Sequence, residues 1–285
     1  MAETTVLASI RSVVLKRGSS PALSWLDPID IARDDLHHGS CADVGQDQDC
    51  NGTTSGSAQS RSAAPVASCL SFSEVWAHCL RIAHLLRGFG VGALHRRSSS
   101  CHGVGLAVDE APALPLLELA VFMAGGWIVP LDPRDPSARL AHVLECAQLV
   151  LAVAQDATAC AVVEAAVALA SFPAESGEHP RPKVVLATEL IDVRPLTLPN
   201  TDAVPSSASA DLGEPLPEAT SHIFFTSGST GRPKGCVVTH RSLLSYCAAR
   251  NSVYHVGEDA TTFVASAHTF DPSLGDLMAT WLAGG

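Results

Sequence analysis

The sequence predicts an α/β fold in which mostly parallel sheets are covered by helices. Short apolar segments alternate along the chain with segments whose apolar residues recur at helical spacing. The apolar segments at 104–108, 127–131 and 149–153 are almost continuously hydrophobic. Such runs are typical of parallel strands that are buried on both faces of their sheet.

The composition limits the function classes. The chain has 285 residues, of which 47% are hydrophobic, so it can bury a sizeable core as one large or two ordinary domains. A net charge of −11 argues against nucleic acid or an anionic membrane surface as partner. No run of roughly 18 apolar residues occurs, so we expect no membrane span. Nine cysteines without a C-x-x-C pair favour a reducing compartment, and we expect a cytoplasmic protein.

The N-terminal segment allows two interpretations. Residues 4–20 contain basic residues and serines but no acid, a composition that weakly resembles an organelle transit peptide. Val6, Ile10, Val13 and Val14 lie at helical spacing, which favours an amphipathic helix that opens the domain.

A strand is expected at 22–26, and a low-complexity region follows. From about 37 to 68 the chain consists largely of Gly, Ser, Asp, Gln and Ala, and such a segment cannot bury enough apolar surface to become ordered. We therefore predict a disordered surface insertion there. It contains four potential metal ligands, His37, His38, Cys41 and Cys50. Because they lie in low-complexity sequence, we expect no metal site.

The next helix has clear signals at both ends. Ser71 and Glu74 form a capping box, and Gly88 ends the apolar pattern that follows. Residues 88–93 fit G-x-G-x-x-A, but a dinucleotide fingerprint follows a strand and opens a helix. Since this stretch closes a helix, we interpret it as a cap and turn.

The remaining elements follow from periodicity and punctuation. We expect strands at 104–108, 127–131, 149–153, 183–187 and 262–266, and helices at 114–123, 137–146, 158–170, 241–250 and 272–282. The Pro- and Ser-rich residues from about 195 to 220 predict a loop.

The most informative stretch is TSGSTGRPKG, at 226–235, between apolar strand segments at 222–225 and 236–238. Glycines let a backbone turn its N–H groups inward around an anion. Hydroxyls add donors and Lys234 adds a positive charge that can meet phosphate. We predict a loop that wraps polyphosphate through Thr226, Ser227, Gly228, Ser229, Thr230, Gly231 and Lys234.

Two other interpretations of this loop fit less well. A flexible Ser/Gly linker seldom carries Pro-Lys-Gly with strands on both sides. A Walker A motif needs Gly-Lys followed by Ser or Thr before a helix. Here Lys234 is followed by Gly235 and a strand, so a P-loop ATPase or kinase is a poor fit.

The ten residues resemble the phosphate-binding signature of the adenylate-forming superfamily, which includes acyl-CoA synthetases, luciferases and amino-acid adenylation domains. Residues 70–74, 104–140 and 270–273 resemble three further motifs in the right order, although Phe72 replaces a Tyr. The resemblance implies that ATP and Mg²⁺ are used and that a carboxylate attacks the α-phosphate to give acyl-AMP. The acyl group then passes to a thiol of CoA or of a carrier-protein phosphopantetheine arm. No general base is needed, and no catalytic residue is assigned.

Phe270-Asp271-Pro272-Ser273 resembles the amino-acid-activating form of the fourth motif. The resemblance implies that Asp271 pairs with a substrate ammonium and that Phe270, Pro272 and Gly275 line the pocket. It also points to the β-alanine-activating, aminoadipate-semialdehyde-dehydrogenase-like branch. Alternatively, Asp271 only caps the helix that starts near Pro272. An acyl- or aryl-CoA ligase would place a His or apolar residue here, and His268 leaves that register open.

His240, at the start of a helix, is expected to be structural or capping. The resemblance covers about residues 5 to 285 without the insertion, so residues 1–285 correspond to an incomplete N-terminal lobe of an AMP-binding (adenylation) domain. The later Tyr-Gly-x-Thr-Glu motif, the ribose-binding Asp, the hinge and the small C-terminal domain do not occur in this sequence. We therefore expect weak or no adenylation by this chain alone. A truncated, non-catalytic remnant or binding module is the competing interpretation. A serine hydrolase is disfavoured because G-x-S-x-G is lacking.

Overall fold

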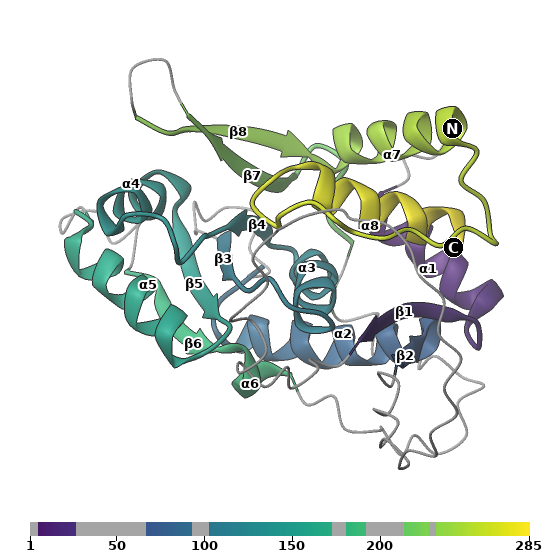
Figure 1. Ribbon diagram of the computed structural model, residues 1–285, viewed down its shortest axis with the longest axis horizontal. Helices are drawn as coiled ribbons and strands as arrows, with labels where there is room; N and C mark the ends of the chain where they lie inside the picture. The colour runs from purple at the N-terminus through teal and green to yellow at the C-terminus, as the bar shows by residue number, and fades with distance from the viewer. Residues whose placement is uncertain are drawn as a thin grey trace, which may run out of the picture.

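The computed structural model describes residues 5–26, 67–92, 103–172, 181–191, 212, 214–227 and 232–285. Within these ranges the chain has the predicted α/β fold (Figure 1). A six-stranded sheet has the strand order β6-β5-β3-β4-β7-β8, and a two-stranded sheet joins β1 and β2. The larger sheet is mostly parallel and helices flank it, as the sequence predicts.

The parallel strands of the larger sheet are β3 (Gly103–Ala107), β4 (Trp127–Pro130), β5 (Leu149–Ala154), β6 (Lys183–Leu186) and β7 (Thr220–Thr226). The last strand, β8 (Lys234–Thr239), is antiparallel to β7. β3 and β5 are almost completely buried, which explains why their sequences are continuously apolar rather than alternating.

Two hydrophobic clusters lie on opposite faces of this sheet, because successive strand residues point to opposite sides. Leu106 belongs to one cluster and its neighbour Ala107 to the other. The first cluster contains side chains from α1 (Val6–Arg17), α2 (Phe72–Gly88), α3 (Ala113–Ala124), α7 (His240–Tyr254) and α8 (Pro272–Ala283). The second contains side chains from α4 (Ser137–Ala147) and α5 (Ala157–Leu169).

The opening helix α1 is part of the core, in agreement with the amphipathic interpretation. Thr5 caps it, and Val6, Ile10 and Val14 are buried. The helix packs against α8, and the Arg17 guanidinium donates to the backbone carbonyls of Glu258 and Gly284. The first and the last helix of the chain therefore lie side by side (Figure 1).

The predicted capping box at the start of α2 is confirmed. The Ser71 N–H donates to Glu74 Oε2 at 2.8 Å, and the Glu74 N–H donates to Ser71 Oγ at 3.4 Å. The helix ends at Gly88, and the chain then turns through Gly90 and Gly92, whose φ angles are +92° and +69°. The predicted cap and turn is therefore confirmed over 88–92.

The predicted strand at 262–266 is wrong. These residues have no regular structure, and the Phe263 side chain is 87% exposed. A β-prone sequence forms a strand only where a neighbour completes its hydrogen-bond ladder, and no described strand pairs with this segment. The segment instead lines a cavity of about 940 Å³, together with β1 (Pro21–Leu26), α3 and α8.

Several boundaries also differ from expectation, and the helix expected at 241–250 runs from His240 to Tyr254. Ala67 and Ser68, placed in the predicted insertion, belong to β2 (Ala67–Ser71), which pairs antiparallel with β1. The remainder of the insertion, with its potential metal ligands, lies outside the described residues. Most of the predicted 195–220 loop also lies outside them, and its last residue, Thr220, begins β7. Ala187, expected at the end of a strand, begins the unpredicted helix α6 (Ala187–Leu190).

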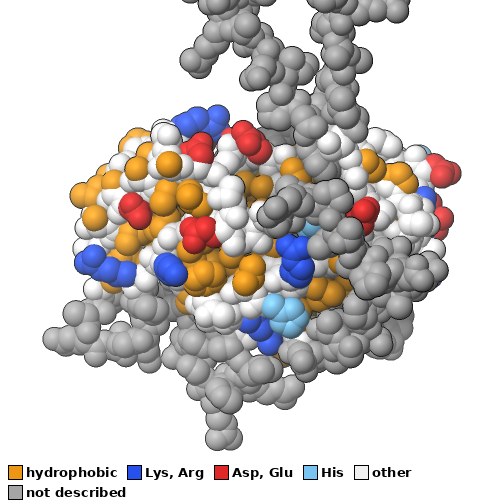
Figure 2. Space-filling model, turned by 90° about the horizontal axis from the view of Figure 1, so that it is seen from below, with side chains coloured by type: hydrophobic (Ala, Val, Ile, Leu, Met, Phe, Trp, Pro, Cys, Tyr) orange, Lys and Arg blue, Asp and Glu red, His pale blue; other side chains and the backbone are white. Residues whose placement is uncertain are grey.

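The surface agrees with the acidic composition. On the face seen from below, apolar side chains are interspersed with acidic and basic ones, and the described residues there form no continuous basic patch (Figure 2). Within the described ranges, no helix combines the length and the apolar character needed to cross a bilayer.

Candidate functional site

The two strands that flank the predicted phosphate loop form a β-hairpin. β7 and β8 pair antiparallel from Thr220↔Thr239 to Thr226↔Lys234, which confirms the strands expected on both sides of the loop. Thr226, Ser227 and Lys234 have exposed side chains at the loop end of this hairpin. Residues 228–231, which include the predicted contacts Gly228, Ser229, Thr230 and Gly231, lie outside the described residues.

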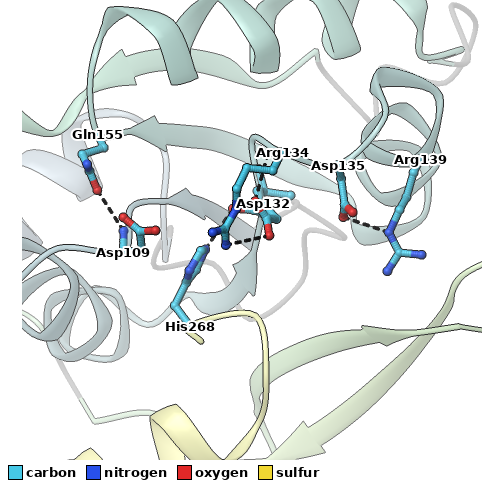
Figure 3. Close-up of polar contacts among 8 residues, drawn as sticks. Asp109, Asp132, Arg134, Asp135, Arg139, Gln155 and His268 are labelled. Atoms are coloured by element: carbon cyan, nitrogen blue, oxygen red, sulfur yellow. Dashed lines mark hydrogen bonds and ion pairs between the residues drawn. The ribbon is translucent and has the colours of Figure 1, made fainter. Parts of the chain in front are cut away.

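The carboxyl edge of the sheet carries polar side chains beside this hairpin. Because α3 and α4 cover opposite faces, the edge at β3 and β4 is a topological switch point, where open α/β sheets bind ligands. Asp109 follows β3, Asp132 follows β4 and Gln155 follows β5 (Figure 3). The Asp109 N–H donates to Gln155 Oε1 at 3.0 Å, which joins the ends of β3 and β5.

Two acidic side chains near this edge, Asp132 and Asp135, form ion pairs with arginines. Arg134 donates from Nε to Asp132 Oδ1 at 2.8 Å and from a terminal nitrogen to Asp132 Oδ2 at 3.0 Å (Figure 3). The hydrogen bond from the Arg134 side chain is the main cause that lowers the pKa of Asp132. Asp135 pairs with Arg139 at 2.8 Å. The lowered pKa keeps Asp132 ionised, and the two ion pairs order the β4–α4 connection.

His268 holds the neighbouring 270–273 segment against the same edge. Its side chain is buried, and Nε2 lies 3.0 Å from the carbonyl oxygen of Leu131, the residue after β4 (Figure 3). This contact places the 270–273 segment beside the switch point, although 137 residues separate His268 from Leu131. Sequence reasoning treated His268 as a possible substrate-facing residue; the structure instead gives it a buried backbone contact.

The proposed substrate residues have different environments. Asp271 and Phe270 are exposed, Pro272 is half-buried and Gly275 is buried. Asp271 occupies the N-cap position of α8, but its side chain makes no capping hydrogen bond. The capping-only interpretation therefore gains no support, and the carboxylate remains available to another partner.

The side chain of Tyr246, which the sequence did not single out, packs against Gly275 where a larger residue would carry its Cβ atom. A Cβ atom built on Gly275 would lie 2.6 Å from Cε1 of Tyr246, on α7. The two helices are also joined by an ion pair of 2.7 Å between Arg250 and Asp276. Burial, followed by the charge of Asp276, raises the pKa of Tyr246. No local signal marks Tyr246, since its contact with Gly275 depends on how α7 and α8 pack.

Gly275→Ala is expected to destabilise the wild-type protein by about 1 kcal/mol, since the new methyl group overlaps the Tyr246 ring. Alanine is intrinsically about 1 kcal/mol better than glycine in a helix. In a Tyr246→Ala background the same substitution should therefore become stabilising. Urea denaturation of the two single variants, the double variant and the wild type measures this change of sign. Additive effects would contradict the contact.

His240 has the structural role expected for it. Its side chain is fully buried, and its ring meets that of Phe122 edge to face with centroids 4.8 Å apart. The helix cap belongs instead to Thr239, whose Oγ1 accepts from the Ser242 N–H at 3.2 Å. Burial lowers the pKa of His240 to about 4, so the ring is neutral near pH 7.

The α/β fold and the hairpin at its sheet edge agree with the family comparison. The model of the AMP-binding enzyme family matches residues 57–285, and the chain belongs to this family. The predicted resemblance to the adenylate-forming superfamily is thereby confirmed.

Among the curated relatives, nonribosomal peptide synthetase 7 of Gibberella zeae is 31% identical over 216 residues. The match covers 76% of this chain and 4% of that protein. Nonribosomal peptide synthetase ecdA of Aspergillus rugulosus is 28% identical over 216 residues, covering 76% of this chain and 3% of that protein. The chain therefore spans only a few per cent of the length of these relatives.

Solved structures share the fold at low sequence identity. VinN matches 99% of this chain and 55% of its own chain, with a TM-score of 0.63 and 16% identity. The peptide synthetase FmoA3, in its α-methyl-L-serine-AMP-bound form, matches 76% of this chain and 20% of its own, with a TM-score of 0.53 and 21% identity. A putative long-chain-fatty-acid CoA ligase from Rhodopseudomonas palustris matches 76% of this chain and 50% of its own chain, with a TM-score of 0.57 and 18% identity.

Proposed function

We propose that this chain belongs to the machinery that activates an amino acid with ATP, as an aminoacyl-adenylate, for transfer to a phosphopantetheine or CoA thiol. The observation that carries the proposal is the hairpin, which brings Thr226 and Ser227 to the same end as Lys234. The exposed Asp271 lies on a segment held at the neighbouring sheet edge. The peptide synthetase relatives support the same function.

In this reaction a substrate carboxylate oxygen bonds to the α-phosphorus of ATP, and the bond to the β-phosphate oxygen breaks. Pyrophosphate leaves with the electron pair. Lys234 would meet the phosphates, where its charge offsets the charge that develops on the leaving group. The residue fits this role because its exposed ammonium forms no ion pair with any described residue.

Mg²⁺ fits the same arrangement. This ion is usually held by one or two carboxylates together with substrate phosphates and water, rather than by a cage of protein ligands. The part of the chain that the structure describes holds no group of three or more His, Cys, Asp or Glu side chains suited to a metal. The phosphates held by the hairpin would therefore supply most of the metal's ligands.

Asp271 is proposed to pair with the substrate ammonium, with Phe270 and Pro272 lining that pocket. A carboxylate that holds an ammonium contributes a charge-assisted hydrogen bond, which favours amino acids over simple acids. ATP–pyrophosphate exchange with β-alanine, other amino acids, fatty acids and aryl acids tests the substrate class. Stimulation by fatty or aryl acids alone would favour the CoA-ligase alternative. Because weak or no exchange is expected of the 285-residue chain alone, the assay uses a protein that also carries the Tyr-Gly-x-Thr-Glu motif and the small C-terminal domain. ATP binding without any exchange by that protein would favour a non-catalytic binding module.

Lys234→Ala is expected to weaken binding of Mg²⁺–ATP by roughly 10- to 100-fold, which corresponds to the loss of one charge-assisted phosphate contact. Isothermal titration of the 285-residue chain measures this effect. Lys16→Ala is the control, because Lys16 is an exposed lysine on α1. Equal affinity of the wild type and the Lys234 variant, or no binding by either, would overturn the assignment of the loop.

A further inference from the structure

Helix α4 contacts the phosphate hairpin through one long-range hydrogen bond. His142, in the middle of α4, lies with Nε2 3.2 Å from the carbonyl oxygen of Pro233, a residue 91 positions later. A carbonyl can only accept, so Nε2 carries the hydrogen and donates it. Cys146, one turn further along α4, lies with its Sγ 3.7 Å from Nε2 and 3.9 Å from Nδ1 of the same ring.

Pro233 lies where the strand pairing of the hairpin ends. The last pair of the β7–β8 ladder is Thr226↔Lys234, so Pro233 is the first residue beyond the ladder on the β8 side. Proline has no N–H, and its carbonyl is its one backbone group able to form a hydrogen bond. The contact with His142 uses that group. It therefore holds the C-terminal stem of the phosphate loop at the place where strand pairing stops.

The hairpin needs this support because its loop end leaves the sheet. The register that joins β7 to β4 consists of Ile128↔His222, four residues before Thr226. Beyond it, β7 and β8 extend over α4 (Figure 1). α4 itself is firmly held: Leu140 and Leu144 are buried, and Arg139 pairs with Asp135. His142 is therefore presented from a fixed support.

We propose that His142 is a positioning residue for the phosphate loop: by donating to the Pro233 carbonyl, it fixes the direction of the two neighbouring cations, Arg232 and Lys234. Arg232 comes close enough to α4 for its charge to act on Cys146, although burial dominates and raises the pKa of that thiol. The nucleotide part of this inference rests on the proposed function. The ordering of the hairpin by His142 does not.

The first experiment measures amide hydrogen exchange of the nucleotide-free 285-residue chain. One net hydrogen bond contributes about 1 kcal/mol, so His142→Ala should speed exchange in peptides covering 234–239 about fivefold. His142→Gln keeps an N–H donor and should recover much of the protection. His84→Ala is the matched control, since His84 is exposed on α2. Equal exchange in the wild type and His142→Ala would overturn the proposal.

The second experiment measures Mg²⁺–ATP affinity and thermal stability of the same variants. We expect His142→Ala to bind ATP several-fold more weakly at nearly unchanged melting temperature, with recovery in His142→Gln. ATP binding that is equal in the wild type and His142→Ala would overturn the positioning role, even if exchange increases. Absence of ATP binding by the wild type would overturn the proposed function instead, and the exchange result would then decide the hairpin role by itself.

Discussion

Gly92→Ala is expected to lower the free energy of unfolding by about 3 kcal/mol or more. A Cβ atom on Gly92 would lie 1.6 Å from the backbone oxygen of Ala124, at the end of α3. Neither group can move aside easily, because Arg87 donates to the same oxygen at 3.2 Å and Gly125 ends the helix with a φ of +84°. The φ of +69° at Gly92 adds strain for any residue with a side chain. Thermal unfolding should shift downward by roughly 6 °C or more.

Gly90→Ala is the matched control for this prediction. Gly90 lies in the same turn and has a φ of +92°, but a Cβ atom there meets nothing within 4 Å. The Gly90→Ala variant should therefore lose only about 1–2 kcal/mol of stability, from the strain of a positive φ angle. If the two variants lose the same stability, the contact between this turn and the end of α3 has no energetic importance.

Replacing Glu118 by methionine is expected to stabilise the protein increasingly as the pH rises. Glu118 lies on α3 and is only 3% exposed, in the wall of the 940 Å³ cavity. No described residue forms a hydrogen bond or ion pair with its carboxyl group. Burial raises its pKa from the ordinary value of 4.5 to about 8. The side chain therefore stays protonated in the folded protein where the unfolded chain has already ionised.

The sign follows from proton binding. Between pH 4.5 and pH 8 the folded state binds more protons at Glu118 than the unfolded state, so the stability contributed by this group falls as the pH rises. The loss is on the order of 3–5 kcal/mol across this window. Glu118→Met removes this pH-dependent loss of stability. The free energy of unfolding of the variant should therefore be close to that of the wild type near pH 5 and larger at pH 8.

Urea denaturation of both proteins at several pH values measures the difference. The buried histidines His222 and His240 also titrate with lowered pKa values of about 4, but they are common to both proteins and cancel in the comparison. Glu164→Met, on the exposed side of α5, is the control for replacing a glutamate by methionine at a helix surface. A constant difference for Glu118→Met would show that its carboxyl group titrates normally.

The sequence by itself determined the features that depend on neighbouring residues. The capping box of Ser71 and Glu74 and the turn after Gly88 need only local geometry, and both occur as predicted. The continuous apolar runs at β3 and β5 identified a buried parallel sheet, because both faces of each strand must be covered. The strands around the phosphate loop also follow from local pattern.

Only the tertiary structure decided the contacts that join distant segments. Nothing in the pattern around His142, Tyr246 or His268 indicates that they meet Pro233, Gly275 and Leu131, respectively. The segment at 262–266 has a strand-like sequence but no described neighbour, so it forms no strand. Local propensities depend on residues that are close in the sequence. A strand's hydrogen-bond ladder, the packing of a side chain against a glycine and the hydrogen bond that holds a loop stem each need a partner from a distant part of the chain, and only folding brings that partner near.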